Sequence, residues 1–160
     1  MKFDEINVGN LLRYMGRLGK YHDRLGIVTS IDPTINRENS FELLVKDWQK
    51  NSEEIRAYEG EVWPVTLDVF HLEKIGFAKD KDFNIFRRNG LIVFRPIFYK
   101  YLEDSMHYID KGFVVLNKPM DLPLTEEMVD SSSTPVTNLH TFQNYLAYIG
   151  QNNVDWTVFQ

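Results

Sequence analysis

The stretch Phe83-Asn-Ile-Phe-Arg-Arg-Asn-Gly-Leu-Ile-Val-Phe-Arg95 decides the fold class, because it holds two short apolar runs around Asn89-Gly90. Asn-Gly between apolar runs predicts a type I′ hairpin turn, in which both central residues need positive φ. The chain continues in the same manner, with runs rich in aromatic residues, which suit a pleated and half-buried surface. We therefore expect a mostly antiparallel sheet with strands over 83–88, 91–95, 97–102, 106–109 and 113–116.

The N-terminal third of the chain predicts a second β region. Short apolar runs alternate there with turn signals such as Gly16, Gly19 and Asp32-Pro33, and with the polar stretch 36–40. This spacing favours a small SH3-like barrel or a curled antiparallel sheet. The expected strands cover residues 8–14, 24–31, 41–45 and 58–65.

Two helices complete a predicted α+β fold. The first starts with Thr66 as its N-cap and ends at Gly76, since glycine closes a helix in the left-handed conformation without steric cost. The second covers 137–149 and ends before Gly150, with one apolar face formed by Leu139, Phe142, Leu146 and Ile149. The connector 119–135 is irregular except for a turn of helix over 125–129, and 154–159 reads as a last edge strand. We expect subdomains over 1–65 and 66–160, which the short link Pro64-Val-Thr66 allows to pack as one unit.

Composition excludes several classes of function. Of the 160 residues 43% are hydrophobic, which excludes wholesale disorder, and the net charge of −5 argues against a general polyanion binder. There is no cysteine, so a disulfide framework, a thiolate nucleophile and a cysteine-ligated metal are excluded. The N-terminus lacks the apolar core of a signal peptide, and the apolar runs of about four residues are too short to span a bilayer. The expected location is the cytoplasm.

No catalytic, cofactor-binding or metal-binding constellation emerges from the motifs. The chain has no Gly-x-Ser-x-Gly elbow, no Ser-x-x-Lys pair and no phosphate-binding glycine loop. His71, His107 and His140 are far apart and follow no known ligand spacing. We therefore expect a protein that is not an enzyme and that uses no cofactor or metal.

A polar face on the second helix is the first candidate site. His140, Gln143 and Asn144 are spaced i, i+3 and i+4, so they share a face offset from the apolar one. These side chains donate and accept hydrogen bonds, which suits a partner-binding role, and an unrecognised catalytic centre at His140 is a further reading. The structural alternative weighs more, because buried amides and imidazoles usually bond neighbouring backbone, and the connector 119–135 is the expected partner here.

A basic and aromatic stretch near the N-terminus is the second candidate site. Positive charges attract phosphates and aromatic rings stack on unpaired bases, so this stretch predicts nucleic-acid binding as an alternative function. A solvated hairpin tip in an acidic chain is the competing interpretation. The residues concerned are Arg13, Tyr14, Arg17, Lys20, Tyr21 and Arg24.

The order of several short motifs resembles a group of small proteins of unknown activity from Bacteroidetes genomes, many of them on prophages and mobile elements. The motifs are the opening Ile6-Asn-Val-Gly9-Asn10, the Pro64-Val-Thr66 lead into a helix ending at Gly76-Phe77, the aromatic strands, and His140-Thr-Phe142-Gln143-Asn144-Tyr145. Leu67-Asp68 stands where the group has an acidic pair. The resemblance implies a phage or mobile-element context and no activity. It implies that the expected cytoplasm is that of a bacterial host cell, or that the location is a virion if the protein is a phage structural component.

These observations lead to one functional hypothesis and one alternative. The absence of catalytic motifs, the 14% of aromatic residues and the acidic C-terminal end opposite a basic N-terminal loop favour a non-enzymatic protein. Such a protein acts through protein–protein contacts, including self-association, with no membrane involved. The alternative is a nucleic-acid-binding accessory protein that uses the 13–24 loop.

Overall fold

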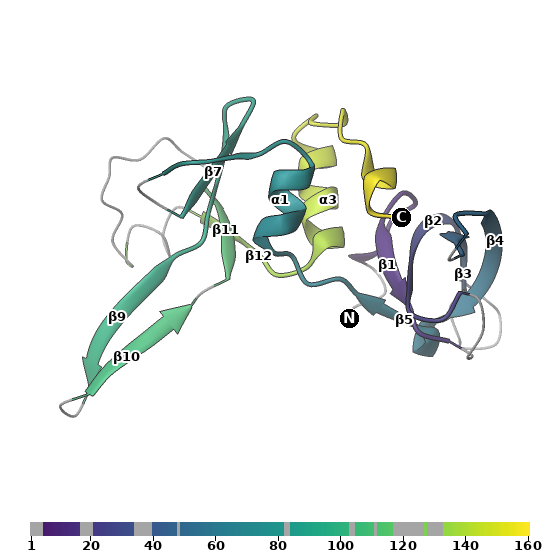
Figure 1. Cartoon of the computed structure of the whole chain (residues 1–160), viewed down its shortest axis with the longest axis horizontal. Coiled ribbons are helices and arrows are strands. Elements are labelled where there is room, and N and C mark those ends of the chain that lie inside the picture. Colours follow the sequence, from purple (N-terminus) through teal and green to yellow (C-terminus); the bar gives the residue numbers. More distant parts are fainter. Residues whose placement is uncertain are drawn as a thin grey trace. The chain divides into compact units, whose positions relative to one another are not determined.

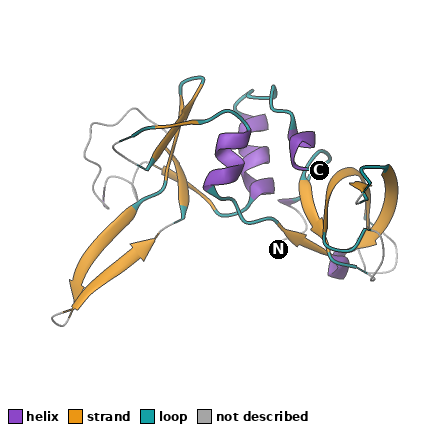
Figure 2. Cartoon of the chain, in the orientation of Figure 1, coloured by secondary structure: helices purple, strands orange, loops and turns teal. Residues whose placement is uncertain are grey.

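The computed structural model describes residues 5–16, 21–33, 40–47, 49–81, 84–102, 105–110, 112–116, 127 and 133–160. These residues form antiparallel sheets and two α-helices, α1 (Val69–Lys74) and α3 (Leu139–Tyr148), which confirms the α+β class (Figures 1 and 2). The chain divides into two compact units: unit 1 comprises 1–66 and 138–160, and unit 2 comprises 67–137. The chain passes from one unit to the other twice, and the predicted boundary near residue 65 lies close to the first of these two points. Residues 138–160, which were expected in the second subdomain, belong to unit 1 with the N-terminal residues.

Unit 1 is built on a five-stranded antiparallel sheet that curls strongly in Figure 1. The hydrogen-bonded order is β4-β3-β2-β1-β5, with β4 and β5 at the two ends, so the sheet is not closed and an SH3-like barrel is not confirmed. The outer strand β5 has three residues and ends at Pro64, which lacks the N–H that a longer ladder would need. The strands are β1 (Leu11–Tyr14), β2 (Arg24–Asp32), β3 (Ser40–Lys46), β4 (Ser52–Tyr58) and β5 (Val62–Pro64).

The inner face of this curled sheet forms the core of unit 1. Gly26 lies directly opposite Val45, and an added Cβ at Gly26 would come within 2.9 Å of a Val45 methyl group, so glycine permits the close approach of β2 and β3. The expectation of one strand over 58–65 is wrong, because a 3₁₀ turn, η2 (Glu59–Glu61), separates β4 from β5. The buried cluster consists of Ile6, Leu12, Tyr21, Val28, Phe41, Leu43, Val45, Ala57 and Val62.

Helix α3 also belongs to unit 1 and buries the predicted residues Leu139, Phe142 and Leu146. The helix begins two residues later than expected, because the Leu139 N–H donates to the Val65 carbonyl (2.7 Å) and Thr66 forms a β-bridge with Asn138. The predicted edge strand over 154–159 is wrong. Those residues form the 3₁₀ helix η3 (Trp156–Phe159), whose N-cap Asp155 accepts a hydrogen bond from the Thr157 N–H (2.9 Å).

Unit 2 holds a second five-stranded antiparallel sheet, in the order β12-β11-β8-β7-β6. The predicted Asn-Gly hairpin is confirmed, since Arg88 pairs with Leu91 and both turn residues have positive φ, 49° at Asn89 and 80° at Gly90. Part of the predicted connector forms β12, an outer strand, where Pro135 is tolerated. The strands are β6 (Ala78–Lys79), β7 (Ile85–Arg88), β8 (Leu91–Phe94), β11 (Phe113–Leu116) and β12 (Ser133–Val136), and β9 (Ile97–Leu102) pairs with β10 (Ser105–Asp110) in a separate hairpin. The turn expected over 125–129 lies outside the described residues, apart from the helical Glu127.

Helix α1 of unit 2 starts at a different cap from the one expected. Asp68, and not Thr66, is the N-cap, because the Asp68 carboxylate accepts from the His71 N–H (3.0 Å) while the Asp68 N–H donates to His71 Nδ1 (3.1 Å). This reciprocal pair satisfies two groups at the helix start. Gly76 closes the helix at φ 90°, as predicted.

Candidate functional site

The predicted polar face of α3 holds the N-terminal segment of unit 1 in place. Gln143 is buried, and its side chain accepts from the Leu11 N–H (2.7 Å) and donates to the Gly9 carbonyl (3.1 Å). Asn144 accepts from the Asn10 side chain (2.8 Å) and donates to the Glu5 carbonyl (2.6 Å). The two amides therefore bond the chain's own residues 5–11, whereas most of the connector 119–135, which the sequence suggested as their partner, lies outside the described residues.

His140, the third residue of this face, is fully buried, with 0% of its surface exposed. Neither ring nitrogen has a hydrogen-bond partner within the described part of the chain. Burial lowers the pKa of His140, and the nearby Glu5 carboxylate opposes that effect only in part. Burial therefore favours the neutral imidazole.

The predicted basic and aromatic residues do not form one surface. Arg13 is exposed and donates to the Asp23 carboxylate (2.5 Å), which lowers the pKa of Asp23. Tyr21 is buried and its hydroxyl bonds the Glu53 carboxylate, while Tyr14 packs against the core of unit 1. The two rings expected to stack on bases thus contribute to the protein interior. Arg24 lines a pocket described below, and Arg17 and Lys20 lie outside the described residues.

The opposite, outer face of the β1 end of the sheet presents a row of side chains that the sequence did not reveal. Arg13 lies directly opposite Trp63 on β5 and directly opposite Leu25 on β2, so the three residues share one face. Leu11, on the same face of β1, is fully buried near Gln143, whereas Trp63 is 53% exposed. We call Trp63, Arg13 and Leu25 the outer row.

An acidic corner adjoins the Trp63 end of the outer row. It consists of Glu59 and Glu61 on η2, a turn that has no basic residue. The Glu61 carbonyl accepts from the Met15 N–H (2.8 Å), and the Glu61 carboxylate accepts from the Tyr58 N–H (3.1 Å), so the corner is fixed to β1 and β4. Tyr58 and Met15, which these hydrogen bonds join to Glu61, are themselves exposed.

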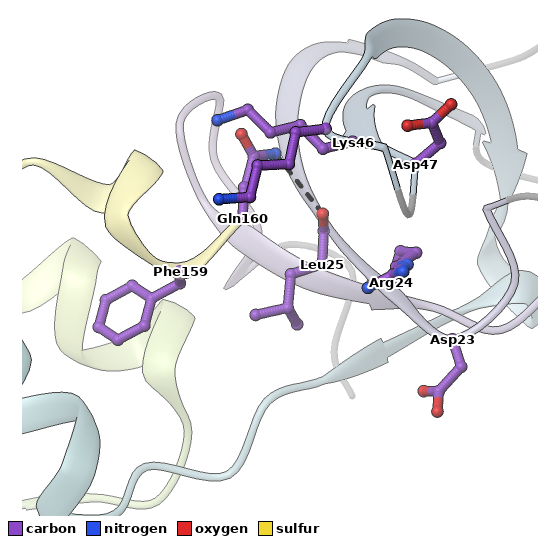
Figure 3. Close-up of a pocket in the computed structure, with 8 residues that line it drawn as sticks. Asp23, Arg24, Leu25, Lys46, Asp47, Phe159 and Gln160 are labelled. Carbon is purple, nitrogen blue, oxygen red and sulfur yellow. Dashed lines mark hydrogen bonds between the residues drawn. The ribbon is translucent and has the colours of Figure 1, made fainter.

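A cationic pocket of about 260 Å³ adjoins the Leu25 end of the outer row (Figure 3). Its cations are Arg24, Lys46 and Lys50. Two carboxylates also line it, but Asp23 is paired with Arg13, and Asp47 accepts from the backbone N–H groups of residues 49 and 51, both at 2.9 Å. The pocket therefore has an excess of positive charge. The remaining lining comes from Leu25, Phe159 and Gln160, whose amide donates to the Leu44 carbonyl (2.6 Å).

The lysines of the pocket lie at a tight turn between β3 and β4, where Lys46 ends β3 and Lys50 belongs to the turn. Lys50 has a φ of 65°, a left-handed conformation that is unusual for a side chain with a Cβ, and its N–H donates to the Asp47 carbonyl (3.0 Å). The only sequence signal was the turn-forming Asp47 between two lysines. No sequence signal pointed to the outer row, because its residues come together only through the pairing of β1 with β2 and β5.

Fold and surface together define a small α+β protein that exposes the outer row between an acidic corner and a cationic pocket. Comparisons with protein-family models, curated proteins and solved structures found no match to the chain. Within the described residues, no three His, Asp or Glu side chains converge as metal ligands would. Neither helix of that part is long and apolar enough to cross a membrane.

Proposed function

We propose that this chain is a non-enzymatic protein that acts by binding another protein through the outer row of unit 1. The observation behind the proposal is Trp63, which is 53% exposed on an outer strand directly opposite Arg13. Tryptophan, tyrosine and arginine are the residues that concentrate binding energy at protein interfaces. The phage or mobile-element setting enters the proposal from the sequence resemblance alone.

The surroundings of Trp63 support a protein partner. Tyr58 and Met15 are exposed, and the N–H of each donates to Glu61, from Met15 to the carbonyl and from Tyr58 to the carboxylate, so the turn that leads into Trp63 is an ordered frame. An ordered frame reduces the conformational entropy that binding must overcome. Loss of one such tryptophan at an interface typically weakens affinity by about 30-fold or more.

The proposal is tested by capture on the immobilised full-length chain from a lysate of the source organism. Trp63→Ser is compared with Tyr148→Ser, a matched control that removes an exposed ring from α3 of the same unit, where Tyr148 is 89% exposed. Half of each sample is treated with nuclease. We expect a nuclease-resistant protein that is retained by wild type and Tyr148→Ser and lost with Trp63→Ser. Equal retention by both variants would show that the outer row is not the binding surface.

Single-stranded nucleic acid is the second candidate ligand, and the cationic pocket is the observation that favours it. Lys46 and Lys50 join Arg24 there, and the Phe159 ring lines the same space. The placement of Tyr14 and Tyr21 in and against the core makes this candidate the weaker one. It predicts salt-sensitive binding of single strands that weakens on Arg17→Ala, Lys20→Ala and Lys50→Ala. No binding at low salt would end it.

A further inference from the structure

We propose that the protein bound by the outer row is a second copy of this chain, related to the first by a two-fold axis through the row. The inference rests on the proposed function, because it names the partner for the same surface. All the residues involved belong to unit 1.

The argument begins with the order of charges along the surface. The acidic corner lies at the β5 end of the row and the cationic pocket at the β2–β3 end, with Trp63, Arg13 and Leu25 between them. Four strands cover this distance, which amounts to about 14 Å at ~4.8 Å per strand. Two regions of opposite charge therefore flank a centre formed by Trp63, Leu25 and the Arg13–Asp23 ion pair.

Such an arrangement is complementary to itself. If a second copy is turned by 180° and laid on the first, its acidic corner meets the cationic pocket and its pocket meets the acidic corner. The two contacts between a corner and a pocket are then identical, as a two-fold interface requires. The rows then face each other at the centre, where each Trp63 is covered.

The lysines of the pocket are suited to this role. Within the described residues, neither Lys46 nor Lys50 forms an ion pair with a carboxylate inside 4 Å. The two pocket carboxylates are already occupied, Asp23 by Arg13 and Asp47 by turn N–H groups. Lys46 acts on the Asp155 carboxylate, whose pKa it helps to lower, but without an ion pair inside 4 Å. The carboxylates of Glu59 and Glu61 from a second copy would supply direct partners for both lysines. The aspartates beside the cations would repel the many phosphates of a nucleic-acid backbone. They would repel one or two localised carboxylates of a protein partner less.

Sedimentation velocity of the full chain across a wide range of concentration tests the inference. Wild type should show a concentration-dependent dimer, and Trp63→Ser should weaken it about tenfold or more. The double variants Lys46→Glu/Lys50→Glu and Glu59→Lys/Glu61→Lys should each be monomeric, since both contacts then join like charges. Their equimolar mixture should dimerise again, because each acidic pocket meets a basic corner.

Matched controls keep the outcome interpretable. Lys79→Glu/Lys81→Glu makes the same charge change on exposed positions of unit 2 and should leave the dimer intact. Glu59→Lys alone is a milder variant, since it spares the bond from Tyr58 to Glu61, and circular dichroism verifies that each variant is folded. Species that grow beyond twice the chain mass would overturn the two-fold arrangement in favour of head-to-tail assembly.

The inference and the proposed function fail in different ways. If wild type stays monomeric at every concentration while Trp63→Ser still loses a captured protein, the second copy is refuted and the binding surface stands. If wild type is monomeric and capture does not depend on Trp63, both are refuted. A mixture of the two charge variants that stays monomeric, when wild type dimerises, refutes the pairing of corner with pocket.

Discussion

Replacing Gln143 by leucine should destabilise unit 1 by about 2–4 kcal/mol. The substitution removes the acceptor for the Leu11 N–H (2.7 Å) and the donor to the Gly9 carbonyl (3.1 Å). Leu11 is fully buried, so no water replaces the lost acceptor. Each of the two backbone groups that lose their partner costs about 1–3 kcal/mol, and the added apolar surface of leucine offsets only part of the sum.

Urea unfolding followed by tryptophan fluorescence measures this effect. The three tryptophans, at positions 48, 63 and 156, all fall within unit 1, so their emission reports on that unit. Gln49→Leu is the matched control, because it makes the same change at an exposed position of a turn. A loss in Gln143→Leu no larger than that in Gln49→Leu would refute the reasoning, and so would an unchanged hydrogen-exchange rate at the Leu11 amide.

Three further predictions concern stability. Burial lowers the pKa of His140 in the folded protein, so the unfolded chain binds a proton first as the pH falls below about 6.5. Wild type should therefore lose stability between about pH 6.5 and the lower pKa of the folded state. The variant His140→Leu lacks this group and should lose less. The fall in the free energy of urea unfolding between pH 7.5 and pH 5.5 is measured for both proteins. An equal fall in wild type and in His140→Leu would contradict this prediction. Gly26→Ala should cost about 1–3 kcal/mol through the clash with Val45, whereas Gly60→Ala, with open space around it, should be nearly neutral in the same assay. Lys50→Gly should raise the free energy of unfolding by about 1 kcal/mol, because the left-handed backbone suits glycine; a destabilised variant would argue against the turn as described.

Local features of the fold were predictable because neighbouring residues determine them. Asn89-Gly90 specifies its own turn geometry, and Gly76 and Gly150 close helices through a conformation that other residues avoid. The apolar face of α3 follows from spacing alone, and Leu139 is buried as expected. The missed N-cap of α1 was a choice between two adequate capping residues, which only the observed backbone decides.

Features that depend on distant pairing were not predictable. Gln143 bonds Leu11 across 132 residues of sequence, and this contact assigns α3 to the first unit. The outer row likewise needs the register of β5 and β2 against β1, which places Trp63 beside Arg13. Spacing showed that Gln143 and Asn144 share a face, but only the fold shows that residues 5–11 use their hydrogen bonds.

One measurement tests most directly whether opposite charges on the outer face bring two copies together. It is the mass in solution, by light scattering, of the variant that exchanges both regions at once, Lys46→Glu/Lys50→Glu/Glu59→Lys/Glu61→Lys. Self-complementarity predicts that this variant recovers the wild-type dimer although each double variant alone is monomeric. A folded fourfold variant that stays monomeric at concentrations where wild type is dimeric would contradict it.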